Sequence, residues 1–199
     1  MTLTQSTILP LGCGDFRISY HTSDHGDCVS VSRGDLSGLV PIVRLHASCL
    51  FGESFHALDC ECADQLTSTL QLIVENNSGV LVYRYAEGRG IGLENKIKAL
   101  ELQRTREVNT VEAFRILGFN PDVRDYAAEL VALDDLRVNK NIKAATQNPR
   151  KLAALVSHGY SLVEEIHPEV RVTRDNVREL IAKKILLGYH INLEPRLGT

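Results

Sequence analysis

The N-terminal part of the chain alternates short β-prone runs with polar turns. Gly14–Tyr20 and Cys28–Ser32 are two such runs, and the polar segment 21–27 separates them. Leu39–Ala47 contains β-branched residues and follows a glycine, so it is predicted to be a third and stronger strand. Pro41 would place part of this strand at a sheet edge or at its start. This part of the chain is therefore predicted to be rich in β-structure.

From residue 63 onward, helical and strand patterns alternate. Apolar residues recur at helical spacing in Ala63–Asn76, which is predicted to be a helix. The further predicted elements are helices at 93–103, 110–117, 126–136, about 150–159 and 174–187, and strands at 80–85, 142–146 and 161–166. This alternation predicts an α/β (mixed α+β) fold in a single domain, residues 1–199, with loosely held ends at about 1–8 and 191–199.

Bulk composition narrows the function classes. The chain has 199 residues, of which 44% are hydrophobic and 24% charged, as in an ordinary globular domain. Its formal net charge of −3 argues against a general nucleic-acid-binding protein, which would carry a basic surface. No apolar run is long enough to span a membrane, and Met1–Pro10 lacks the pattern of a signal peptide, so we expect the protein in the cytoplasm.

Three closely spaced cysteines, Cys49, Cys60 and Cys62, are the most informative residues. The odd count of five cysteines, with three crowded together, fits a metal site in a reducing compartment better than a disulfide framework. Zn²⁺ prefers thiolate ligands, and three of them leave one tetrahedral position for water, as in a catalytic site. Bound Zn²⁺ lowers the pKa of that water to near neutrality, so hydroxide becomes available to attack carbon.

Two plainer interpretations of these cysteines stay open at the level of sequence. Free cysteines are common core residues, so the three could be buried without any metal. Alternatively, His56 could supply a fourth ligand and close a Cys₃His site, which would then be structural rather than catalytic.

Five ordered motifs resemble the GTP cyclohydrolase II family, and the similarity runs from Leu9 to about His190. In chain order the motifs are RLHASC (44–49) with DCECA (59–63), YAEGRGIGL (85–93) with NKI (95–97), TVEAF (110–114) with LGF (117–119), DVRDY (122–126) and TQNPRK (146–151). Because five motifs match in order and at matching separations, the resemblance is highly specific, and it implies the fold of that family.

The resemblance also implies an activity. In this family GTP loses pyrophosphate, hydroxide generated at zinc opens the imidazole ring at C8, and formate leaves. The product is a diaminopyrimidinone ribosyl phosphate, and the reaction opens riboflavin biosynthesis. The resemblance implies one Zn²⁺ per chain at the cysteines, Mg²⁺ with the substrate phosphates, GTP as substrate and a homodimer as the assembly.

Individual roles follow from the matched positions. Cys49, Cys60 and Cys62 match the zinc ligands. Arg124 matches the residue proposed to take the nucleotidyl group at the α-phosphate, and Asp122 matches the proposed proton acceptor, although an Asp–Arg pair taken alone is also a common surface ion pair. The positions that match the nucleotide site are Arg44, His46, Gln65, Glu87, Gly88, Arg89, Thr110, Thr146 and Lys151. The carboxylate among them, Glu87, could accept hydrogen bonds from the N1–H and amino group of guanine.

The chain departs from the family at several positions near the expected site. The family's Glu, Arg, Gln and Asn are replaced here by Ser48, Asp59, Ala86 and Phe114. Leu100 stands where the family carries a tyrosine on the helix after the glycine-rich loop. A phenol can donate a hydrogen bond to a developing oxyanion, and losing such a donor typically costs on the order of 10²–10³ in rate. Leu100 also fits as a plain core residue.

Three hypotheses follow from these departures. Ring opening at C8 could stall, so that the formyl group is retained as a formamidopyrimidine nucleotide. The base pocket could instead be rebuilt for another nucleotide. From a different class, the chain could be a catalytically inactive relative that binds nucleotide and regulates a partner, although all three cysteines that match the zinc ligands are retained.

Overall fold

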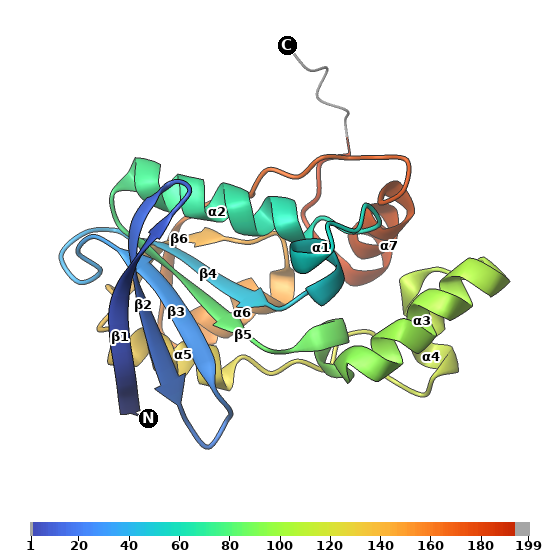
Figure 1. Ribbon diagram of the computed structural model, residues 1–199, viewed down its shortest axis with the longest axis horizontal. Helices are drawn as coiled ribbons and strands as arrows, with labels where there is room; N and C mark the ends of the chain where they lie inside the picture. The colour runs from blue at the N-terminus through green and yellow to red at the C-terminus, as the bar shows by residue number, and fades with distance from the viewer. Residues whose placement is uncertain (1, 194–199) are drawn as a thin grey trace, which may run out of the picture.

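A single mixed sheet organises the protein (Figure 1). The computed structural model describes residues 2–193, and within them seven strands pair in the order β1-β2-β3-β5-β4-β6-β7. The strands are β1 (Thr2–Leu11), β2 (Gly14–Thr22), β3 (Cys28–Arg33), β4 (Ile42–Ala47), β5 (Gly79–Arg84), β6 (Asn141–Ala145) and β7 (Ser161–Ile166). The pairs from β1 to β5 are antiparallel, whereas β5, β4, β6 and β7 run parallel. The predicted mixed α/β fold is confirmed.

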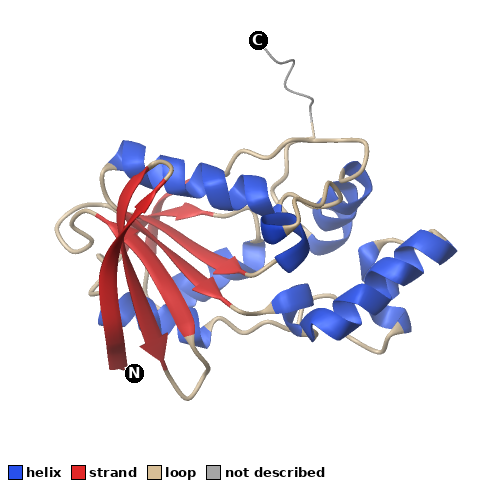
Figure 2. Cartoon of the chain, viewed as in Figure 1, coloured by secondary structure: helices blue, strands red, loops and turns tan. Residues whose placement is uncertain are grey.

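Helices cover both faces of the sheet and extend beyond one end of it (Figures 1 and 2). They are α1 (Leu50–Ser54), α2 (Cys62–Asn76), the 3₁₀ turn η1 (Glu87–Gly90), α3 (Gly92–Arg106), α4 (Thr110–Ile116), α5 (Ala127–Asp135), α6 (Pro149–Ser157) and α7 (Val177–Leu187). Helix α2 lies on one face, and α5 and α6 lie on the other. Helices α3 and α4 project past the sheet and share a small core of their own. Within residues 2–193, no helix is long and apolar enough to cross a membrane.

Strand β4 divides its side chains between the two faces. Successive residues of a strand point to opposite sides, so Val43 and Leu45 enter the core beneath α5 and α6. Ile42 enters the core beneath α2, and Arg44 and His46 share its side of the strand. All five are at most 3% exposed. Arg44 and His46 are thus buried on the face of the sheet that α2 covers.

The structure adds a strand that the sequence pattern did not indicate. Most of the segment expected to be a loosely held end, 1–8, belongs to β1, which pairs with β2 from Leu11 opposite Gly14 toward the N-terminus. Consecutive residues Ile8 and Leu9 are both exposed, at 51% and 44%, so β1 lacks the alternating apolar face that would have marked it. Of the other expected loose end, 191–199, the residues after 193 lie outside the described part.

We predict that Gly34→Ala destabilises the fold. Gly34 follows β3 with φ +75°, and a Cβ there would lie 1.9 Å from the carbonyl oxygen of Asn77. This overlap with backbone, added to left-handed strain, should cost at least about 2 kcal/mol of unfolding free energy in urea titrations. Gly12→Ala is the matched control, because a Cβ at Gly12 meets nothing within 4 Å. Equal stability of the two variants would contradict this account.

Candidate active site

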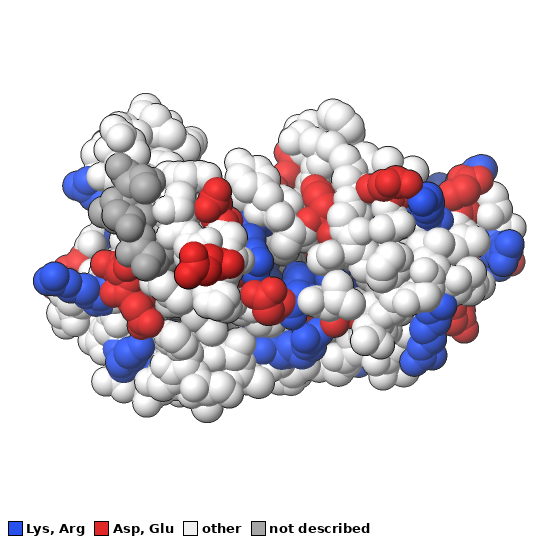
Figure 3. Space-filling model, turned by 90° about the horizontal axis from the view of Figure 1, so that it is seen from below, with Lys and Arg blue, Asp and Glu red and all other residues white. Residues whose placement is uncertain are grey.

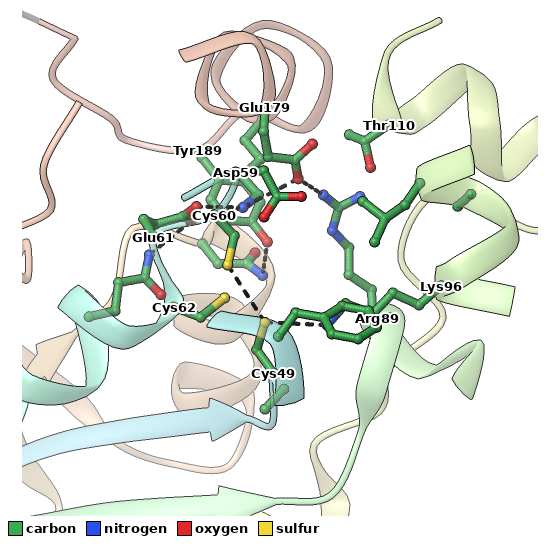
Figure 4. Close-up of a pocket in the computed structure, with 18 of the residues that line it drawn as sticks. Cys49, Asp59, Cys60, Glu61, Cys62, Arg89, Lys96, Thr110, Glu179 and Tyr189 are labelled. Carbon is green, nitrogen blue, oxygen red and sulfur yellow. Dashed lines mark hydrogen bonds and ion pairs between the residues drawn. The ribbon is translucent and has the colours of Figure 1, made fainter. Parts of the chain in front are cut away.

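The three cysteines meet where two helices begin. Cys49 follows β4 and is the N-cap of α1, and Cys62 is the first residue of α2. The Sγ atoms of Cys49 and Cys60 are 3.7 Å apart, and all three sulfurs lie within 4.8 Å of one another. Figure 4 shows them facing each other across a small space. The N-terminus of α2 carries partial positive charge, which favours a thiolate. In the absence of a cation this is outweighed at Cys62, where the hydrogen bonds with Cys49 and Cys60, together with burial, raise the pKa well above its usual value.

The spacing of the sulfurs fits a tetrahedral metal ion. Thiolates bound to Zn²⁺ at about 2.3 Å lie about 3.8 Å apart, close to the Cys49–Cys60 separation. Gly52 keeps the space open, because a Cβ at that position would lie 2.6 Å from the sulfur of Cys60. His56 is exposed and is not among the described residues whose ligand atoms meet at this cluster. The structure therefore lends no support to a closed Cys₃His site.

In the absence of a bound cation, ionisation of one thiol of the cluster makes ionisation of the others less favourable. Hydrogen bonds from Cys60 and Cys62 lower the pKa of Cys49, and the bond with Cys49 raises the pKa of Cys60 to about 12. The ammonium of Lys96 lies 3.2 Å from the sulfur of Cys49 and 2.7 Å from the carboxylate of Glu87. One thiolate is thus stabilised by the protein itself, and ionising the others requires a metal ion.

The cysteine cluster forms part of the wall of a pocket of about 540 Å³. This volume is in the ordinary range for small-molecule sites. The remaining wall comes from the ends of β4 and β6, from η1 and α3, and from α4 and α7. Seen from below, the protein has a hollow between the part that holds the sheet and the part that holds α3 and α4, and basic side chains gather in it (Figure 3).

Two buried basic side chains in this pocket have no acidic partner among the residues that the structure describes. Arg44 donates to Nδ1 of His46, to the carbonyl of Ala145 and to Gln65, at 3.0, 3.0 and 2.6 Å. Lys151 donates to the carbonyl of Leu45 at 2.6 Å. Within residues 2–193 neither forms an ion pair, and burial lowers the pKa of Arg44 to about 10 and that of Lys151 well below its usual value. A bound anion would offset both effects.

A third cation, Arg124, is paired. Its Nε and Nη2 donate to the two carboxylate oxygens of Asp122 at 2.9 and 2.7 Å, and Nη2 lies 3.4 Å from the hydroxyl of Tyr189. Although burial opposes it, the hydrogen bond to Asp122 raises the pKa of Arg124, and the same contact lowers the pKa of Asp122 despite burial. Arg124 therefore stays a protonated guanidinium beside an ionised carboxylate.

Helix α7 brings a second group of charges to the pocket. Glu179 is hydrogen-bonded to Arg89 and lies 3.3 Å from Lys183, one turn further along α7. Lys183 in turn contacts both carboxylate oxygens of Glu61, at 2.8 and 3.0 Å. Figure 4 shows the carboxylate of Glu179 facing the guanidinium of Arg89. Glu61 lies between Cys60 and Cys62 in the chain, so this network joins α7 to the cysteine cluster.

Two buried polar atoms of the pocket wall have no hydrogen-bond partner among the described residues. They are the hydroxyl of Ser48, which is 9% exposed, and the amide oxygen of Gln147, which is 7% exposed. Buried polar groups are normally hydrogen-bonded. These two are therefore available to a ligand.

Most residues predicted from the sequence share this pocket. Those on its wall are Cys49, Cys60, Cys62, Arg44, His46, Gln65, Gly88, Arg89, Leu100, Thr110, Arg124, Thr146 and Lys151. Asp122 and Glu87 do not line it. Asp122 holds Arg124, and both carboxylate oxygens of Glu87 are occupied, by the backbone N–H of Leu50 and by Lys96. The expected contact of Glu87 with a base would have to form beside these bonds, on the remaining lone pairs of the carboxylate.

Sequence reasoning missed the part of the wall that comes from α7. Glu179 and Lys183, together with Tyr189 and Gln147, were not predicted as site residues. The available signal was weak: Glu179 and Lys183 are four residues apart on one face of a helix, a spacing typical of exposed pairs as well. Only burial separates this pair from such a surface pair.

The fold and the site together define a class. This is a mixed α/β protein in which a cluster of three cysteines opens into a pocket whose buried side chains Arg44 and Lys151 have no ion-pair partner within residues 2–193. A family model described as GTP cyclohydrolase II matches residues 3–167, and the chain belongs to that family. Helix α7 lies beyond the matched range.

Individual relatives agree with this assignment. The chain is 39% identical over 188 residues to GTP cyclohydrolase-2 of Streptomyces coelicolor, covering 93% of this chain and 84% of that one. It is also 38% identical over 187 residues to the riboflavin biosynthesis protein RibBA of Chlorobium phaeovibrioides, covering 92% of this chain. The chain spans about half the length of such RibBA relatives, 45% in this case.

Among solved structures, the chain is similar to RibBX, a two-domain 3,4-dihydroxy-2-butanone 4-phosphate synthase from A. baumannii. The TM-score is 0.46 and the identity 14%, covering 84% of this chain and 40% of that one. This likeness is too weak to support an inference about function.

We predict that Lys183→Met destabilises the protein strongly. The substitution leaves Glu61, which is 2% exposed, as a buried carboxylate without its cation. Breaking a buried pair in this way typically costs about 3–5 kcal/mol. In urea titrations, the double variant Glu61→Gln with Lys183→Met should regain part of that loss. A double variant less stable than the sum of the two single effects would contradict the pairing.

Proposed function

We propose that the chain catalyses hydrolytic opening of the imidazole ring of GTP, with release of pyrophosphate and with Zn²⁺ at Cys49, Cys60 and Cys62. The observation that carries the proposal is that the three sulfurs and the unpaired cations Arg44 and Lys151 face the same pocket. Membership of the GTP cyclohydrolase II family and the names of the relatives support it. When bound, the metal supplies Lewis acidity and a water whose pKa is near neutrality.

The chain's own residues would bind and orient the nucleotide. The cations Arg44, Lys151 and Arg124 line one pocket, so a triphosphate would meet positive charge from β4, α6 and the loop after α4. Mg²⁺ would accompany those phosphates. The unsatisfied Ser48 hydroxyl and Gln147 amide oxygen would bind polar groups of the substrate, because both atoms lack partners in the described residues.

Arg124 and Asp122 suit electrostatic catalysis. A guanidinium can act as a nucleophile only after losing a proton, and the bidentate pair with Asp122 makes that loss harder. We therefore propose that Arg124 binds the α-phosphate as a cation and that Asp122 holds it in position. This role differs from the nucleophilic role that the family resemblance suggests.

A second outcome is favoured by one observation, the place of Leu100. Its side chain lines the pocket from α3, and a leucine cannot donate a hydrogen bond or a proton. If a donor at this position is needed to expel formate, the reaction would stop with the formyl group still attached. The product would then be a formamidopyrimidine nucleotide.

Turnover of GTP is the direct test of the proposed reaction. Zinc-loaded protein incubated with GTP should release pyrophosphate and yield a ring-opened pyrimidine, detected by mass spectrometry. Cys62→Ser should lose both bound zinc and ring opening, since it removes one of three ligands. Cys13→Ser, a cysteine outside the cluster, is the matched control and should retain both. Nucleotide that is bound but chemically unchanged would instead indicate an inactive regulator.

Leu100→Tyr places a hydrogen-bond donor at the position where the family carries a tyrosine. If the lost donor limits formate release, the variant should produce more formate per ring opened, by about 10²-fold for one well-placed donor. Formate and pyrimidine are quantified in the same reaction, so the ratio is independent of total activity. Stoichiometric formate from the unaltered protein would remove the reason for this second outcome.

A further inference from the structure

A second cluster of metal-binding side chains lies outside the pocket wall. Glu165 is near the end of β7, His167 follows that strand, and His190 follows α7. One carboxylate oxygen of Glu165 lies 2.9 Å from Nε2 of His167 and 2.6 Å from Nδ1 of His190. The three ligand atoms all lie within 4.8 Å of one another, and the side chains are 28%, 43% and 46% exposed.

The donor set has a definite chemical preference. Two imidazoles and one carboxylate suit borderline divalent ions such as Zn²⁺ and Ni²⁺, whereas Ca²⁺ and Mg²⁺ prefer oxygen ligands. Because the cluster is partly exposed, water can complete the coordination. Metal would bind the ring nitrogens as free lone pairs, so any proton they share with Glu165 would leave to solvent.

The cluster joins two segments that are distant in sequence. β7 runs parallel to β6, whose end leads into Thr146 and Gln147 on the pocket wall. His190 donates its backbone N–H to the carbonyl of Gln147 at 2.9 Å. The preceding residue, Tyr189, lines the pocket, and its hydroxyl lies 2.8 Å from the side-chain amide nitrogen of Asn148. The segment is therefore held to the pocket on one side and to Glu165 on the other.

We propose that Glu165, His167 and His190 form a second divalent-metal site, of the Zn²⁺ or Ni²⁺ class, and that a bound ion cross-links the end of β7 to the segment after α7. The site shares no residue with the three cysteines. It does not depend on the proposed reaction with GTP.

The test uses tag-free protein whose cysteine site has first been filled with zinc. Isothermal titration with Ni²⁺ should then detect one further ion per chain, with zinc content unchanged by elemental analysis. His167→Ala combined with His190→Ala should weaken Ni²⁺ binding by well over tenfold, since the loss of even an outer-shell partner typically costs 10–100-fold. Glu165→Gln should weaken it as well, with little risk to the fold.

His158→Ala is the matched control. His158 is a partly exposed histidine paired with Asp134 at 2.6 Å, but it belongs to no group of three ligands in the described chain. Its variant should bind Ni²⁺ like the unaltered protein. No second ion, or an unchanged affinity in the double variant, would overturn the site. Hydrogen exchange at residues 188–191 should slow when Ni²⁺ binds, and unchanged exchange would overturn the cross-link.

Discussion

Three thiols held within 4.8 Å of one another are the constraint on which the rest of the site depends. Without a cation, hydrogen bonds from Cys60 and Cys62 stabilise one thiolate at Cys49 and lower its pKa, and the same bonds raise the pKa values of Cys60 and Cys62. The arrangement is anchored in regular elements: Cys49 follows β4, which is buried from Ile42 to His46, and Cys62 begins α2. Gly52 leaves the space between the sulfurs that a metal ion needs.

The pocket combines two kinds of positive charge. Arg89, Arg124 and Lys183 have carboxylate partners, so their charge is largely balanced within the protein. Arg44 and Lys151 are buried without a carboxylate partner in the described part of the chain, and burial lowers the pKa of each. Burying a cation in this way is unfavourable unless an anion arrives, so these two residues indicate the ligand's charge more clearly than the ion-paired residues do.

The altered family positions also acquire local explanations from their surroundings. The guanidinium of Arg89 lies over the ring of Phe114, with its Cζ atom 5.2 Å from the ring centre. This cation–π contact stabilises a cation of the pocket wall. Ser48 leaves an unsatisfied hydroxyl on the wall. Leu100 makes its part of the wall apolar. These changes modify the pocket while leaving the sulfur cluster intact.

The sequence by itself determined most of the elements, the family and the cysteines of the cluster. Helical periodicity marked α2, the alternation of strand and helix patterns placed β5 and β6, and motif order identified Cys49, Cys60, Cys62 and the cations. Local pattern could not show β1, whose exposed apolar residues do not alternate. Nor could it show that the carboxylate of Glu87 forms an ion pair with Lys96. Glu179 and Lys183 join the site only because α7 packs against Arg89 and Glu61, which lie 90 and 122 positions earlier in the chain. Tyr189, just after α7, reaches Arg124 and Asn148 in the same way. Burial and long-range pairing decide such roles, and both are properties of the folded chain.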